Sequence, residues 1–545
     1  MRTILCATLV GLVSSFRPLE TSLRLPTSLS STLEQPRIIQ HRDTYDRESW
    51  TQGFSSVKEE TCFELKGKFP ADLKGTFFQN GPAKFEVGDE IVVHQFDADG
   101  HISAITFDDG KAWFRNRYVR TPGFVKEQET QKVSGRGVFG TAKNKGKWWS
   151  NIFDVSFKKV ANTHVLFRNN RLFALWEASL PFEINPVTLE TLGETRIDDT
   201  LEPDDRYSAH YSIDPRNGNV VNFAIMPGDS LDPNENHNLL MVEHDKDMNL
   251  VYRTKHVIPG FGLAHDCTIS ENYLGVFQAP SNFDPLPFVL GQKGVGQCIT
   301  WDNEATSSKF HLVPRTPDGQ VISIDVPKTF NFHVANMFED ADGTVVCDVV
   351  LADFLMMADT ENTVYPEKPL WETVDFASGE IPKYSLTRIR VDPKQATLVS
   401  FEKLTESAAA TVDFPAIHPD YISRPYSLAH IGCSASATDM SPLQGLLKLN
   451  VQTGEALEKW LPAEEHEYLS EFVFVPRGEG EEDGYLLGYK MDAKNKKTSV
   501  VLFDAKNLSQ GPVVESELDI FLPHALHGTF VPGFTPKMVN TAASR

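Results

Sequence analysis

Short apolar runs separated by turn-forming residues recur along the chain from about residue 37 onward. Turn dipeptides stand next to several of them: Asn217-Gly218 before residues 219–226, Asp342-Gly343 before residues 344–350, and Thr453-Gly454. Asn-Gly and Asp-Gly form the tight turns that join antiparallel strands. Because no long amphipathic helical pattern dominates, the sequence predicts an all-β fold. It has no exact repeat period, so the pattern alone does not distinguish a sandwich, a barrel and a propeller.

One predicted strand, residues 330–339, is mostly apolar and carries a single histidine, His333. Such a histidine is more often a core residue bonded to backbone than a metal ligand. Three others have similar surroundings: His210 in Ala209-His210-Tyr211, His265 in Ala264-His265-Asp266, and His527 in Leu526-His527-Gly528. The stretches between them are far too long for a local metal loop. A β-propeller would bring them together, because each blade points one strand at a common axis.

Further motifs occur in a fixed order along almost the whole chain from about Gln35 onward. They are residues 75–82 (GTFFQNGP), 96–100 (FDADG), 116–121 (NRYVRT), 161–163 (ANT), 175–177 (LWE) and 471–477 (EFVFVPR), together with the four histidine segments. This series resembles the carotenoid cleavage oxygenases, non-haem iron dioxygenases, and within them the bacterial type that cleaves apocarotenoids to retinal. The resemblance implies a seven-bladed β-propeller with a helical and loop cap over the iron-bearing axial end.

The resemblance also implies the site. The metal ligands would be His210, His265, His333 and His527, binding Fe(2+). The carboxylates that orient them would be Glu177 for His265, Asp413 for His333, and Glu471 for His527. At one of these positions the family has a longer glutamate, so Asp413 must shift its backbone, use a water or hold its histidine less firmly. His524 is the main competitor of His527 for the fourth position, and the His-Gly-Thr match favours His527.

Three more residues match family positions near the iron. Thr163 would crowd one open coordination position, although an ordinary strand threonine is the simpler interpretation without the match. Trp176 and Phe332 would shape a substrate tunnel, with core packing as the alternative. Stilbene-cleaving members carry lysine where this chain has Trp176, which favours an apolar polyene.

The expected reaction is Fe(II)-dependent cleavage of a conjugated C=C bond of a carotenoid or apocarotenoid by dioxygen, giving aldehydes such as retinal. Two alternatives stay open: a stilbene-cleaving dioxygenase, and a non-catalytic propeller that serves as a binding scaffold. A scaffold would have no reason to keep four ligand histidines with carboxylate support.

Composition restricts the partners. The formal net charge of −22 argues against nucleic acid and against attraction to anionic lipid, so any peripheral membrane contact must be apolar. The 36 phenylalanines are expected to pack between sheets, with some lining a tunnel. The six cysteines are dispersed without a C-x-x-C pair, which does not indicate a disulfide framework.

The sequence divides into two parts. Residues 1–36 carry Arg2, the apolar residues 4–13 and then a Ser-, Thr- and Arg-rich stretch, which predicts a targeting segment. Its signal-plus-transit character favours a plastid, with the secretory pathway or cytoplasm as alternatives. Residues 37–545 would form the propeller. Residues 283–290, too proline-rich for a central strand, and residues 351–370 are candidates for the cap.

Overall fold

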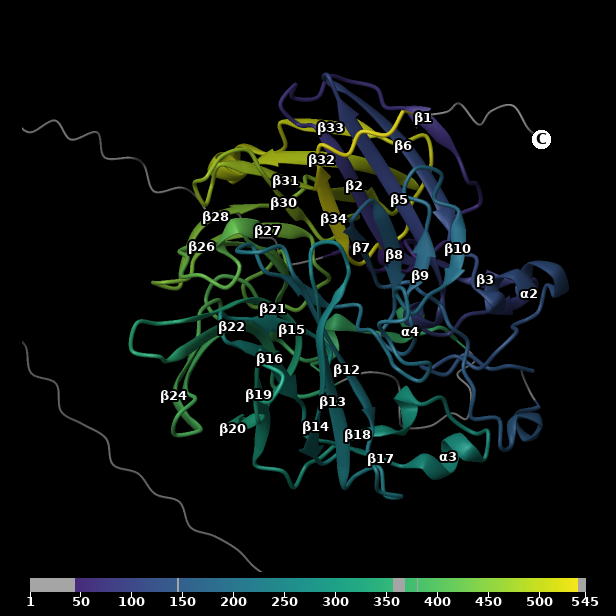
Figure 1. Cartoon of the computed structure of the whole chain (residues 1–545). Helices are drawn as coiled ribbons and strands as arrows, with labels where there is room; N and C mark the ends of the chain where they lie inside the picture. Colours follow the sequence, from purple (N-terminus) through teal and green to yellow (C-terminus); the bar gives the residue numbers. More distant parts are fainter. Residues whose placement is uncertain (1–44, 145–146, 356–367, 380, 538–545) are drawn as a thin grey trace, which may run out of the picture. The chain divides into compact units, whose positions relative to one another are not determined.

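The computed structural model describes residues 45–144, 147–355, 368–379 and 381–537 (Figure 1). The chain divides into two units, Met1–Ile38 and Ile39–Arg545. The first unit, and with it the predicted targeting segment, lies outside the described residues. Among the residues that are described, every helix is too short or too polar to span a bilayer.

Seven antiparallel sheets of four or five strands account for most of the second unit. The first consists of β1 (Cys62–Glu64), β6 (Lys111–Tyr118), β5 (Asp99–Asp108), β2 (Gly75–Lys84) and β34 (Gly528–Pro532). The second is β10 (Thr191–Glu194), β9 (Phe182–Ile184), β8 (Arg171–Leu175) and β7 (His164–Arg168). The third is β11 (Tyr211–Ile213), β12 (Val220–Pro227), β13 (Asn236–His244) and β14 (Leu250–Pro259).

The remaining four sheets repeat this meander. The fourth is β15 (Cys267–Ile269), β16 (Tyr273–Gln278), β19 (Ser307–Pro314) and β20 (Ile322–Pro327). The fifth is β21 (Phe330–Glu339), β22 (Val345–Ala352), β23 (Tyr384–Asp392) and β24 (Thr397–Lys403). The sixth is β25 (Val412–Ala416), β26 (Leu428–Cys433), β27 (Gly445–Asn450) and β28 (Glu455–Trp460). The seventh is β29 (Glu467–Leu469), β30 (Val473–Pro476), β31 (Gly484–Asp492), β32 (Lys497–Asp504) and β33 (Val514–Glu517).

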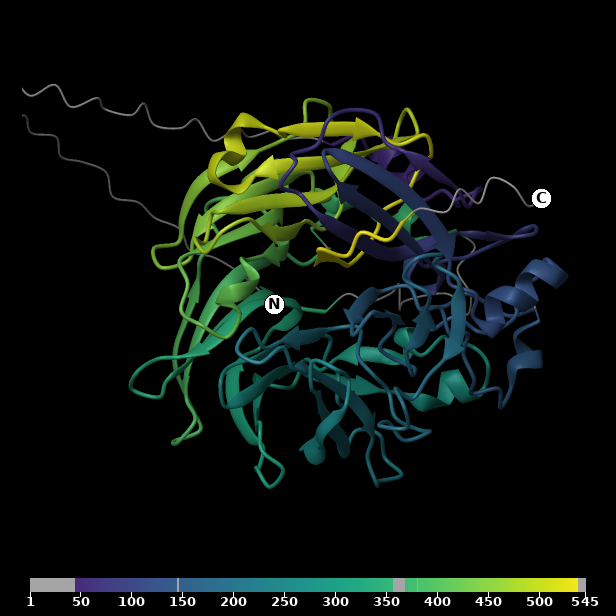
Figure 2. The ribbon, with the colours of Figure 1, turned by 45° about the horizontal axis from the view of Figure 1, so that its top comes forward.

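These sheets are the blades of a seven-bladed propeller, which confirms the predicted fold class. Figure 2 shows the blades arranged around a common axis, with the last strand (yellow) beside the first sheet (purple to blue). The innermost strands contact one another there, β11 with β15, β15 with β21, β21 with β25, and β30 with β34. Strand β34 pairs with β2, so the chain's end closes the ring.

The predicted turns and strands have clear causes. Strand β21 covers the predicted run 330–339, and β12 and β22 follow the Asn-Gly and Asp-Gly turns. Gly218 and Gly343 have φ angles of +78° and +87°, a region that favours glycine. Aromatic side chains fill the space between neighbouring blades: the rings of Phe77 in β2 and Tyr489 in β31 lie 5.7 Å apart in one shared apolar cluster.

Short helices and hairpins outside the blades form the cap. They are α1 (Arg47–Gln52), α2 (Pro122–Thr130), α3 (Pro285–Val289), α4 (Leu370–Thr373), the 3₁₀ turns η1 (Gln95–Asp97), η2 (Trp148–Asn151), η3 (Gly296–Cys298) and η4 (Phe376–Ser378), and the hairpins β3 (Glu86–Val87) with β4 (Glu90–Ile91) and β17 (Ser281–Phe283) with β18 (Ile299–Trp301). Two further 3₁₀ turns, η5 (Pro419–Tyr421) and η6 (Ala505–Gln510), lie between blade strands.

The two predicted cap segments behave differently. The proline-rich segment 283–290 forms α3, which begins at Pro285 after Asp284 caps it by accepting the N–H of Leu286. In the second segment, Leu351 and Ala352 still belong to β22, so that part of the prediction is wrong, because both side chains are buried in the fifth blade. Residues 356–367 lie outside the described residues, and Leu370 begins α4.

The five cysteines within the described residues are all free thiols, as their dispersal predicted.

Candidate metal centre

The four predicted ligands lie in or just before innermost strands, in four different blades. His210 directly precedes β11, His265 stands two residues before β15, His333 lies within β21, and His527 directly precedes β34. Neighbouring residues of a strand point to opposite faces. A shift of one residue along a strand would therefore turn a ligand side chain away from the axis.

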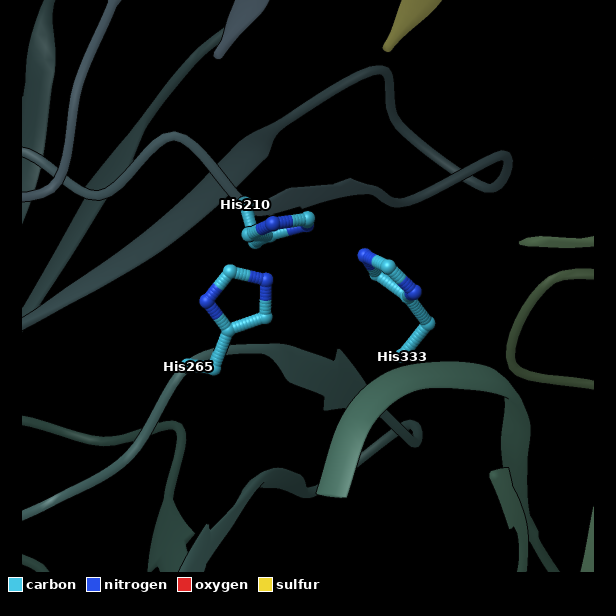
Figure 3. Close-up of side chains that lie close together, drawn as sticks. All are labelled: His210, His265 and His333. Carbon is cyan, nitrogen blue, oxygen red and sulfur yellow. The ribbon is translucent and has the colours of Figure 1, made fainter. Parts of the chain in front are cut away.

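The structure brings these imidazoles together. The ring centroid of His210 lies 4.4 Å from that of His265, 5.2 Å from that of His333 and 4.6 Å from that of His527. The His333 ring is 5.3 Å from His265 and 4.8 Å from His527. One nitrogen from each of His210, His265 and His333 lies within 4.8 Å of the others, and Figure 3 shows these three rings facing a common space.

Two of the ring nitrogens have no hydrogen-bond partner that would compete with a metal. The Nε2 atoms of His210 and His333 are buried and have no hydrogen-bond partner. Burial and the neighbouring imidazoles hold the pKa of His210 well below its usual value, so this ring is neutral and offers a lone pair. A divalent transition metal between the rings would satisfy the partnerless nitrogens, and imidazole suits iron among other metals. The residues therefore fit the implied ion.

Three histidines use their other nitrogen to contact a carboxylate. The Nδ1···O distances are 2.6 Å from His265 to Glu177, 2.7 Å from His333 to Asp413, and 2.9 Å from His527 to Glu471. These are the three pairs that the resemblance implies. A carboxylate at Nδ1 fixes the orientation of the ring and leaves Nε2 to the metal.

The shorter Asp413 contacts its histidine directly, next to an irregular stretch of backbone. The pairing of β25 with β26 shifts register between Asp413 and Pro415, and Phe414 between them has φ +55°. The carboxylate beside this bulge contacts His333 directly, so no bridging water is required. Burial disfavours a charge on His333, but Asp413 outweighs it and raises the pKa of His333 to about 8.

Glu471 joins the last ligand to its strand. One carboxylate oxygen contacts His527 Nδ1, and the other accepts the backbone N–H of Gly528 at 2.8 Å. Burial raises the pKa of Glu471, but the adjacent His527 reverses this and holds the pKa below its usual value. The carboxylate is therefore ionised and fixes both the ring and the start of β34.

A cavity of about 220 Å³ opens beside His265, His333 and His527. Thr163, Trp176 and Phe332 lie in its wall. A second cavity of about 300 Å³ shares part of this wall: Trp50, Gln95, Phe96, Phe139, Phe332, Asp413 and Leu443. Trp50 belongs to α1, and α4 and η4 line the second cavity, so the cap covers the histidine end of the axis.

His524, the competing histidine, lines the same cavity but packs elsewhere. Its ring lies 4.2 Å from that of Trp50 and 5.1 Å from that of Phe54. Burial lowers the pKa of His524 to about 3, which keeps it neutral. No contact joins it to the four clustered rings, which supports His527 at the fourth position.

Two residues at the centre were not predicted from the sequence. His164, next to Thr163, has its ring 5.1 Å from that of His527, and its Nδ1 lies 2.9 Å from the carbonyl oxygen of Ala209. Asp266 directly follows His265, and its carboxylate accepts the backbone N–H of Val334, the residue after His333. The available signal was their position beside a motif residue.

A propeller with an axial group of imidazoles, opening into a largely apolar cavity, defines a metal-dependent enzyme for an apolar substrate. The family model of the retinal pigment epithelial membrane protein matches residues 53–532. Apocarotenoid-15,15'-oxygenase of Synechocystis sp. is 31% identical over 497 residues, covering 89% of this chain and 97% of the relative. Resveratrol cleavage oxygenase 1 of Chaetomium globosum is 30% identical over 519 residues, covering 86% and 84%.

Comparison with solved structures finds the same similarity. The cobalt-substituted apocarotenoid oxygenase of Synechocystis superposes with a TM-score of 0.82 at 31% identity, covering 90% of this chain and 100% of that one. The chain belongs to this family, the carotenoid cleavage oxygenases, and is a dioxygenase.

Proposed function

We propose that the protein holds Fe(II) with His210, His265, His333 and His527 and uses dioxygen to cleave a conjugated C=C bond of a carotenoid or apocarotenoid. The observation that carries this proposal is the meeting of four imidazoles, three of which line an apolar cavity. Synechocystis apocarotenoid-15,15'-oxygenase, a relative along nearly its whole length, supports an apocarotenoid substrate and retinal as a product.

The site's own residues position the reactants. When bound, Fe(II) supplies electron density to dioxygen. The cavity wall, including Trp176 and Phe332, holds the polyene beside the histidines and excludes water, which raises the effective concentration of the two reactants. Thr163 is buried in the same wall, and its carbonyl oxygen accepts the N–H of His527, so it stays fixed beside that ligand.

The reaction balances without another partner. The C=C bond breaks, and each of its carbons forms a C=O bond with one atom of dioxygen. Both oxygen atoms and all electrons are then accounted for in two carbonyl products. No external reductant is required.

The test measures oxygen uptake and products with iron-loaded protein and a panel of carotenoids, apocarotenals and a hydroxystilbene. We expect iron-dependent uptake on at least one polyene, with aldehyde products, and loss of activity in His333→Ala. Absence of uptake on every polyene would defeat the proposal, as would full activity in His333→Ala.

The same panel decides the main alternative. Resveratrol cleavage oxygenase 1 is also a relative, so a stilbene is a reasonable second substrate class. Trp176 in the cavity wall offers an aromatic face and no cation to bind a phenolate. We therefore expect the polyenes to be cleaved faster than the hydroxystilbene, and the reverse order would favour the stilbene.

We also propose peripheral contact with a zwitterionic bilayer through an apolar patch beside α3. The side chains of Trp149, Phe153 and Leu286 are 57%, 78% and 61% exposed. Phe153 donates its backbone N–H to Val289 at the end of α3, and cavity-lining Phe139 lies in the same stretch of chain. The net charge of −22 favours neutral over anionic lipid.

Vesicle flotation tests this contact. The variant Phe153→Asp with Leu286→Asp should lose binding to phosphatidylcholine vesicles and keep its activity in detergent. Val399→Asp, at an equally exposed residue of β24, is the matched control and should bind as the native protein does. Equal flotation of the double variant would contradict the proposal.

We further propose that residues 1–36 direct the protein to a plastid. The support is their composition, with an apolar start followed by a stretch poor in acidic residues. A fluorescent fusion should reach the plastid with these residues and stay outside it without them. Secretion of the fusion, or equal distribution of both forms, would reject it.

A further inference from the structure

One ligand histidine lacks a carboxylate of its own. His265, His333 and His527 each have one within 2.9 Å of Nδ1. For His210 the nearest is Asp266, whose Oδ1 lies 3.5 Å from Nδ1. Asp266 is buried and directly follows His265, so this single carboxylate lies against two ligand segments.

The Asp266 carboxylate also accepts a backbone N–H from the segment of a third ligand. Its Oδ2 accepts the N–H of Val334, the residue after His333, at 2.7 Å. Its Oδ1 accepts the N–H of Cys267, at the start of β15, at 2.6 Å. The bond to Val334 crosses between blades and ties the inner strand of the fourth blade to that of the fifth.

The inner strand of the fifth blade is irregular where it makes this hydrogen bond. The pairing of β21 with β22 shifts register on both sides of Val334, first after Asn331 and again before Asn336. His333 lies within this irregular stretch, where the regular ladder does not fix the strand. The Asp266 carboxylate takes the N–H of Val334 there and so defines the position of the ligand.

We propose that Asp266 is the fourth carboxylate of the metal centre, a positioning residue that sets the relative placement of His210, His265 and His333. This inference rests on the proposed function only in assuming that the four histidines bind a divalent metal. It assigns Asp266 no contact with substrate.

The test is Co(II) binding to metal-free protein without substrate, followed by titration and by the visible absorption of the bound ion. Asp266→Asn keeps the size of the side chain, but its amide nitrogen cannot accept a hydrogen bond. Changing a residue that orients ligands typically weakens metal binding 10–100-fold, so we expect a loss of about that size and an altered Co(II) spectrum.

Asp97→Asn is the matched control. Asp97 is also buried and also accepts two backbone N–H groups, from Phe139 and Thr141, both at 3.0 Å. It contacts none of the four histidine segments, so this variant should keep the native affinity and spectrum even if its melting temperature falls. A merely structural role for Asp266 would make the two variants behave alike.

The inference is overturned if Asp266→Asn binds Co(II) with native affinity and spectrum, or if Asp97→Asn weakens binding equally. Should circular dichroism show that Asp266→Asn does not fold, Asp266→Glu takes its place, with an expected loss of about tenfold and the same criterion. Failure of the native protein to bind Co(II) would instead reject the proposed function.

Discussion

At the scale of single residues, the centre depends on the two nitrogens of each imidazole. In the three carboxylate-paired histidines Nδ1 faces an acid, which leaves Nε2 for the metal. In His210 and His333 this Nε2 is buried without a partner, a costly arrangement that an ion would relieve. His524 has a partnerless Nε2 as well, but its ring lies among Trp50 and Phe54 rather than among the other histidines.

This difference predicts opposite results for two nearby histidines. His527→Ala removes a nitrogen from the cluster and one of the two contacts of Glu471, so Co(II) binding should weaken by at least a hundredfold. His524→Ala removes only ring packing and should keep metal affinity within about threefold. Equilibrium dialysis of both variants measures this. Retained binding in His527→Ala together with lost binding in His524→Ala would exchange the two assignments.

The motifs pointed to the ligands and the carboxylates that orient three of them, but did not indicate a role for Asp266. His333 and its partner Asp413 were found because the motif around each survives, even with the acid one methylene shorter. The bulge at Phe414, beside Asp413, could not be foreseen, because it depends on how β25 pairs with β26. Asp266 was missed because its role lies in contacts to other blades.

At the scale of elements, closure of the ring and placement of the fourth ligand are one event. Strand β34 pairs with β2 from Gly528 onward, directly after His527. Glu471, which precedes β30, contacts both His527 and the N–H of Gly528. Any disturbance of this short strand should therefore reach the metal.

Gly528 offers a test of that link. A Cβ there would lie 2.8 Å from both the Phe77 ring and the carbonyl oxygen of Phe78. Gly528→Val should destabilise the fold by about 1–3 kcal/mol, as overpacking does, and should also weaken Co(II) binding. Urea unfolding and dialysis measure the two effects.

The control is Gly480→Ala, in the hairpin between β30 and β31. A Cβ there meets only the Asp483 side chain, at 3.7 Å. Stability should stay within about 0.5 kcal/mol of the native protein. Normal metal affinity in Gly528→Val, despite a loss of stability, would separate closure from ligand placement.

Individual strands were more predictable than their arrangement. Strand β21 matches its predicted run because its apolar pattern is local, and its neighbours follow from glycine turns. The number of blades did not follow from the pattern, because closure depends on contacts between the two ends of the chain. The extent of the cap was still harder to predict. Residues 351–352 belong to β22, because the apolar run in the sequence continues past the strand into the connection that follows it.

At the scale of the whole molecule, one ion would connect blades that are distant in the chain. Its ligands come from the first, third, fourth and fifth blades, and its carboxylates extend the contacts to the sixth through Asp413 and to the seventh through Glu471. In the absence of an ion, the Nε2 atoms of His210 and His333 remain buried and unpaired. Metal binding should therefore stabilise the entire ring, not only the site.

Removal of the metal tests this coupling. An ion that binds only the folded state stabilises it by about 2.7 kcal/mol at a free concentration of 100 times Kd, so chelation should lower the melting temperature and Fe(II) or Co(II) should restore it.

Two histidine variants are the controls. In His333→Ala, neither chelation nor added metal should change the melting temperature much. His430→Ala, which removes a buried histidine of β26 outside the cluster, should melt earlier but still respond to metal, because its ring contacts the carbonyl oxygen of Ala505 and none of the ligands. If the native protein melted at the same temperature with and without metal, the ion would be bound by a site that is already rigid, and the histidine quartet would not be joining the blades.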